Sequence, residues 1–104
     1  MTNVSRYKDK PLLRLAELYA LWAIDQLPPR DRASLEELAP KLKDLFGGDG
    51  TWQSAVAAAA QFPIDMVLRI RQLWQVDVER AKINTARLDP QSFVEAFVDT
   101  NAPI

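Results

Sequence analysis

Apolar positions recur at helical spacing along the chain and predict five helices. The first, over residues 11–26, is apolar on nearly every side. One stripe consists of Leu15, Leu18, Tyr19 and Trp22, and the opposite stripe consists of Leu13, Ala20 and Ile24. Because a helix that is hydrophobic all round is usually central to a bundle, we expect the other helices to surround this segment.

The second helix is predicted over residues 30–46, after two consecutive prolines. Its expected buried face, with spacings of three and four residues, consists of Leu35, Leu38, Leu42 and Leu45. Ser34 and Glu37 resemble a capping box, so the helix could instead begin at Ser34. Pro40 has no amide hydrogen to donate, and we predict that it kinks the helix rather than dividing it.

Residues 47–50, which contain all three glycines, predict a flexible connection. A third helix follows from residue 51 or 52 to residue 61 and contains four consecutive alanines, which favour a helix. A fourth is predicted over residues 65–83, with Asp65 as its N-cap. Its apolar stripe consists of Met66, Val67, Ile70, Leu73, Trp74, Val78 and Ala81.

The fifth helix is predicted over residues 90–100, because Asp89 and Pro90 together form a strong start signal. We expect it to bury Phe93, Phe97 and either Val94 or Val98. The chain shows no strand-like alternation. The predicted fold is therefore all-α, a single compact five-helix orthogonal bundle with helix one central. One domain would cover residues 1–104, with 1–9 as a flexible lead-in and 102–104 as a tail.

Composition narrows the function classes. Histidine and cysteine are both absent, which removes the side chains that most often carry catalysis or bind transition metals. We therefore predict a protein that is not an enzyme, with no cofactor and no metal. The 13 basic and 14 acidic residues give a net charge of −1, so nothing attracts the whole surface to nucleic acid or to a membrane.

The same features suggest a location. Residues 1–10 are polar and charged, unlike a signal peptide. The longest apolar stretch is interrupted by charges, so no membrane span is expected. The absence of cysteine fits a reducing compartment. We expect a cytoplasmic protein.

Asp77 is the first candidate binding residue, because helical spacing places it near the centre of the fourth helix's apolar stripe. Ile70, Trp74 and Ala81 share that face. One hypothesis is a pocket in which the Asp77 carboxylate binds a small ligand or acts as an acid or base. The other is an internal ion pair with Arg80 or with a charge of the first helix, since an unpaired buried charge is costly.

Arg14 and Glu17 are further candidates, because with Asp25 they interrupt the apolar first helix. They could form a polar pocket or a specific interface, or they could mark a solvent-facing edge of that helix.

Arg69 and Arg71 suggest a different class of function. The third and fourth helices loosely resemble a helix-turn-helix, in which residues 65–83 would enter a DNA groove. The acidic residues Asp65, Asp77 and Glu79 on the same helix argue against it, because phosphate neutralisation drives such binding.

The most informative signal is a surplus of apolar side chains. A domain of this size hides only about two-thirds of its unfolded surface, yet the first helix is apolar all round and nine aromatic residues are spread along the chain. The leading hypothesis is a non-enzymatic protein–protein interaction module, either a homodimer or an adaptor for another protein. A small nucleic-acid-binding protein and a small-ligand binder built around Asp77 are the alternatives.

Overall fold

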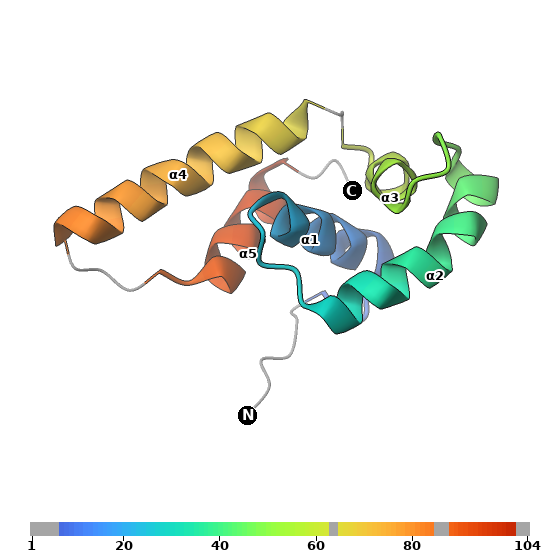
Figure 1. Cartoon of the computed structure of the whole chain (residues 1–104), viewed down its shortest axis with the longest axis horizontal. Helices are drawn as coiled ribbons and strands as arrows, with labels where there is room; N and C mark the ends of the chain where they lie inside the picture. Colours follow the sequence, from blue (N-terminus) through green and yellow to red (C-terminus); the bar gives the residue numbers. More distant parts are fainter. Residues whose placement is uncertain (1–6, 63–64, 85–87, 102–104) are drawn as a thin grey trace.

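The computed structural model describes residues 7–62, 65–84 and 88–101, and within them it contains five helices and no strand (Figure 1). The all-α prediction is therefore confirmed. The predicted ends of the chain, residues 1–6 and 102–104, lie outside the described residues. The helices are α1 (Pro11–Ala23), α2 (Pro29–Phe46), α3 (Trp52–Ala60), α4 (Met66–Asn84) and α5 (Pro90–Asn101).

Helix α1 is central, as its all-round apolarity predicted (Figure 1). It packs against α3, α4 and α5, and Ala16 and Ala20 are completely buried. These small side chains let neighbouring helices approach the α1 backbone closely. The core is therefore centred on a short helix that contains alanines as well as large buried side chains.

Helix α1 ends three residues earlier than predicted. Asp25 adopts a left-handed conformation with φ of 58°, and the Gln26 N–H donates to the Leu21 carbonyl at 2.9 Å. This hydrogen-bonding pattern is that of a Schellman motif, which closes a helix before the chain turns away. The turn at Asp25 ends α1, and the prolines that follow begin α2.

Helix α2 is one continuous helix that contains Pro40, so Pro40 does not divide it. It begins at Pro29, and the Ser34 hydroxyl donates to the Arg30 carbonyl within the helix at 3.2 Å. The alternative start at a Ser34 capping box is therefore wrong, because Pro29 already supplies a favourable first helical residue.

The predicted buried face of α2 is only half correct. Leu35 and Leu42 are buried, but Leu38 is 38% exposed and Leu45 is 66% exposed. Ala39 takes their place in the core. Helix α2 packs mainly against α3, and this contact rotates the helix so that its leucine stripe points partly away from the core.

The glycine-containing connection before α3 is organised by hydrogen bonds rather than being a plain flexible link. The Asp49 carboxylate accepts from the Thr51 amide at 3.0 Å and from the Thr51 hydroxyl at 2.8 Å. Thr51 in turn caps α3 by accepting from the Ser54 amide. These contacts fix the end of α2 relative to the start of α3.

Helix α4 packs against α1, and its C-terminal half extends along one side of the molecule (Figure 1). Ile70 is completely buried, whereas Leu73, Trp74 and Val78 are only half-buried. Trp74 contacts Phe93 of α5 edge-on, with ring centroids 5.1 Å apart. The apolar stripe predicted for this helix is thus covered at its start and only partly covered beyond.

Helix α5 begins at Pro90, as its start signal predicted. The Asp89 carboxylate accepts from the amides of Gln91 and Ser92. Val94, Phe97 and Val98 are all buried, whereas Phe93 is half-buried against Trp74.

Candidate functional site

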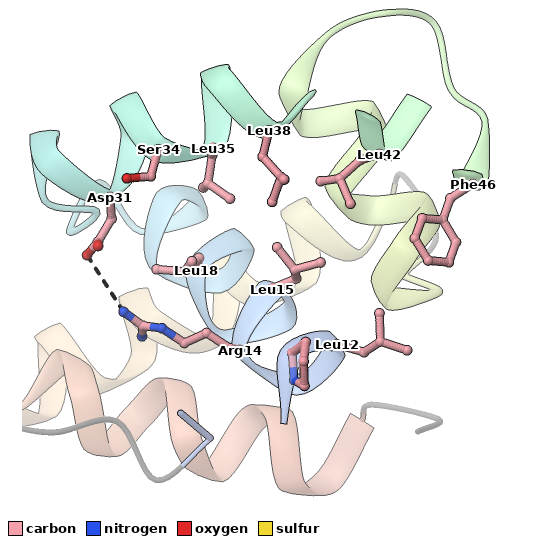
Figure 2. A pocket seen from close by; sticks show the side chains of 11 residues that line it. Leu12, Arg14, Leu15, Leu18, Asp31, Ser34, Leu35, Leu38, Leu42 and Phe46 are labelled. Carbon is pink, nitrogen blue, oxygen red and sulfur yellow. Dashed lines mark ion pairs between the residues drawn. The ribbon is translucent and has the colours of Figure 1, made fainter. Parts of the chain in front are cut away.

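An apolar groove of about 480 Å³ lies between α1 and α2 (Figure 2). Helix α2 packs mainly on α3, while α1 packs on α3, α4 and α5, so the two helices face each other across a gap. The apolar walls are formed by Leu12, Leu15 and Leu18 of α1 and by Leu35, Leu38, Leu42 and Phe46 of α2. Exposed apolar surface gathered in one concavity is a typical binding site.

Both walls of the groove are formed by leucines that recur at helical spacing in the sequence. On α1, Leu12, Leu15 and Leu18 recur every three residues, so they lie along one side of that helix. On α2, Leu35, Leu38 and Leu42 recur at three and four residues and face them. Leu38 and Phe46 remain 38% and 43% exposed. The groove therefore presents large apolar side chains that the chain itself does not cover.

One end of the groove is polar. Arg14 and Asp31 line it, and the Arg14 Nη2 atom lies 3.8 Å from the Asp31 Oδ2 atom (Figure 2). The Arg14 Nη1 atom also donates to the Glu17 carboxylate one turn along α1. The guanidinium group therefore stands between a groove residue and a buried one.

Glu17 is completely buried. The Gln91 side-chain amide donates to Glu17 Oε2 at 2.9 Å and to Glu95 Oε1 at 3.1 Å. Glu17 therefore does not lie on a solvent-facing edge of the first helix, the alternative considered above for its charges. It joins α1 to α5 through a satisfied polar cluster, which is how buried charges are tolerated.

Tyr7 extends this polar contact to the end of α5. Its hydroxyl donates to Asp99 Oδ1 at 2.5 Å and to the Glu95 carbonyl at 3.1 Å. The ring itself is buried. Residues 7–9, which we expected within a flexible lead-in, form a turn that Tyr7 fixes against α5.

Arg71 has a structural role in this fold. Its Nε atom donates to the Ala23 carbonyl at 2.9 Å, and its guanidinium carbon lies 5.7 Å from the centre of the Trp22 ring. A cation at the C-terminal end of a helix is favourable, because the terminal carbonyls carry partial negative charge. Arg71 thus closes the end of α1 and joins it to α4.

Asp77 and Arg69 lie apart from the groove. Asp77 is half-buried on the extended half of α4 and forms no ion pair with any residue that the structure describes. The internal ion pair considered for it is therefore not formed there, because the second half of α4 is only partly covered. Arg69 is exposed beside Asp65 and Asn101.

Of the five predicted site residues, the structure brings only Arg14 and Glu17 together. The groove itself was not predicted, because its walls are leucines that we assigned to the core. Ala39 and four leucines make an apolar stripe on α2 of ordinary width for a core-facing helix, so the sequence carries no separate signal for the groove.

Neither a metal centre nor a membrane span emerges from the described residues. No three acidic side chains there are grouped so that they could hold a metal ion. None of the helices is both long and apolar enough to cross a bilayer.

Comparison of the chain with models of protein families, with curated proteins and with solved structures found no match. The groove is therefore interpreted from its own geometry.

Proposed function

We propose that this protein is a non-enzymatic protein–protein interaction module that binds an apolar helical segment of a partner in the groove between α1 and α2. The observation that carries the proposal is the exposure of Leu38 and Phe46 inside a concavity walled by further leucines. Leu38 and Phe46 are about two-fifths exposed, so a partner that covers them gains roughly 1 kcal/mol from each, a fraction of the value for burying a fully exposed side chain.

The dimensions favour a helix as the bound segment. Along α2 the lining residues run from Asp31 to Phe46, which is about 22 Å at 1.5 Å per residue. The groove volume of about 480 Å³ is too small for a whole helix but accommodates one row of its side chains. Grooves that bind amphipathic helices receive such a row at positions i, i+3 or i+4, and i+7.

The chemistry of the lining supports binding rather than catalysis. Its two charged side chains, Arg14 and Asp31, face each other, and the Ser34 hydroxyl is bonded to the Arg30 carbonyl. This set contains no nucleophile paired with a base, which covalent catalysis requires. We place the protein in the cytoplasm, on its lack of cysteine.

A small apolar ligand is the second candidate, because the volume of the groove falls within the usual range for such sites. The small ligand and the partner helix differ in how much of the open side of the groove they cover. A small ligand that fills only the deepest part of the groove leaves the Phe46 ring partly exposed to solvent, whereas a helix that lies along α2 covers this ring.

The test is a selection of helical peptides from a displayed library against the full chain. We expect binders with an apolar i, i+4, i+7 row whose affinity falls at least ten-fold for Leu38→Lys. Ile83→Lys is the matched control, because Ile83 is an exposed apolar residue of α4 and is 80% accessible. Binders that lose affinity for the control instead, or a library that yields none, would overturn the proposal.

A further inference from the structure

We infer that the partner helix carries a lysine or arginine that pairs with Asp31 at the polar end of the groove. This inference rests on the proposed function and adds to it the charge of the partner. It follows from the hydrogen bonds and the exposure of three side chains, Asp31, Arg14 and Glu17.

The Asp31 carboxylate is the unsatisfied member of this group. It lines the groove with 30% of its side chain exposed, and it accepts no hydrogen bond from any residue that the structure describes. Its ion pair with Arg14 spans 3.8 Å, which is beyond hydrogen-bonding distance. Its oxygens therefore retain acceptor capacity toward the groove.

Arg14 is held more strongly by Glu17 than by Asp31. It donates to Glu17, which is completely buried, whereas Asp31 still reaches water. Withdrawing the guanidinium from a buried carboxylate costs more than withdrawing it from a hydrated one. Arg14 therefore stays with Glu17 and leaves Asp31 only a long-range interaction.

Arginines flank Asp31 on both sides along α2: Arg30 is exposed and does not line the groove, and Arg32 is engaged elsewhere. Arg32 Nε donates to Glu36 Oε1 at 3.2 Å on the exposed side of the helix. Arg14 also lines this end, but its one positive charge is shared by the two carboxylates of Glu17 and Asp31, so the group as a whole disfavours an added anion. A cationic group would find a partner that has no other hydrogen bond, and electrostatic complementarity of this kind selects partners.

The position of Asp31 fixes the place of the basic residue. Leu35, Leu38 and Leu42 follow it at one, two and three turns along α2. The basic residue of the bound helix should therefore lie about one turn beyond the end of its apolar row.

The test uses the peptides selected on the full chain. We expect lysine or arginine to be enriched at one fixed position, one turn from the apolar row. Replacing that residue by glutamate, or Asp31 by asparagine in the protein, should each weaken binding roughly five-fold. The two changes combined should weaken it by less than their product, and Asp31→Lys should favour the glutamate peptide.

Glu37→Gln is the matched control, because Glu37 is an exposed carboxylate of α2 outside the groove. Binders without a basic preference, or equal affinities for Asp31→Asn and Glu37→Gln, would overturn the inference while leaving the groove as a docking site. If Leu38→Lys left the affinity for the selected peptides unchanged, this result would instead contradict the proposed function. Concentration-dependent dimers abolished by Leu38→Lys, with no peptide binding, would identify a second copy as the occupant and overturn the charge assignment.

Discussion

Glu17 shows how a single residue can serve the fold and the site together. It is completely buried on the central helix, and it receives hydrogen bonds from Arg14 on one side and Gln91 on the other. The first contact positions a side chain that lines the groove, and the second joins α1 to α5. A charge inside the core is thus retained where it connects the packing of the bundle to the polar end of the groove.

The first prediction concerns the stability that Glu17 provides. Glu17→Ala should lower the free energy of unfolding by about 2–3 kcal/mol, because it leaves the hydrogen-bonding groups of Arg14 and Gln91 without their buried acceptor. Urea unfolding followed by tryptophan fluorescence measures the change. The exposed Glu37→Ala should stay within about 0.5 kcal/mol of the native chain, and equal effects of the two changes would contradict the role given to Glu17.

Tyr19 gives the second prediction, a dependence of stability on alkaline pH. Burial raises the pKa of its phenol above the ordinary 10.0, and the nearby charge of Arg71 offsets part of this effect. Because the folded state holds the proton more tightly than the unfolded state, the stability contributed is fully present below about pH 10. It is lost as the pH rises through the higher folded-state pKa.

Absorbance at 295 nm measures this titration directly. The native chain should show an absorbance change above pH 10 from Tyr19, and Tyr19→Phe should reduce its amplitude. The same substitution should flatten the decline of stability in alkaline urea unfolding. A high-pH component of unchanged amplitude in Tyr19→Phe would contradict the assignment.

At the scale of elements, the connection between α2 and α3 decides how the groove is shaped, because α2 is held mainly by α3. Gly48 has φ of +116°, and a Cβ atom there would lie 2.8 Å from Ser54 Oγ and 3.3 Å from the Ala55 amide nitrogen. Gly47 also has a positive φ, of +87°, but a Cβ atom there would have no neighbour within 4 Å.

The third prediction compares these two glycines. Gly47→Ala should lower the free energy of unfolding by about 1 kcal/mol through backbone conformation alone. Gly48→Ala should cost about 1 kcal/mol more, because Ser54 must move while its hydroxyl accepts from the Asp49 amide. Thermal unfolding of both variants checks the difference. If the two glycines prove equally sensitive, the close approach of Ser54 is not what organises the turn.

The sequence was most informative where one local signal controls one element. Pro11 and the Asp89–Pro90 pair predicted the starts of α1 and α5, and both helices begin there. The all-round apolar first helix predicted its own central position. These features depend on neighbouring residues only, so no knowledge of the tertiary fold was needed.

The sequence failed where the answer depends on which helices meet. The leucine stripe of α2 was assigned wholly to the core, yet Leu38 lines the groove and Leu45 is exposed, because α2 packs mainly on α3. Asp77 lies at the centre of an apolar stripe, yet the second half of α4 is only partly covered. Helical periodicity gives the face on which a residue lies, but not how far a neighbouring helix extends over that face.

At the scale of the whole molecule, the bundle has a well-covered centre and an uncovered side. Helix α1 packs its apolar surface against α3, α4 and α5, and toward α2 it leaves a groove. The surplus apolar surface predicted from the sequence is partly gathered there. Leu68, Val76 and Ile83 are further exposed apolar residues, on α4.

The most direct test of the groove as a docking site is an NMR measurement of contacts between a selected helical peptide and the methyl groups of the isotopically labelled full chain. The account predicts intermolecular contacts from the peptide's apolar row to Leu12, Leu15 and Leu38, while the methyl groups of Leu68 and Ile83 show none. Contacts confined to the α4 residues, with the groove leucines unchanged, would contradict it.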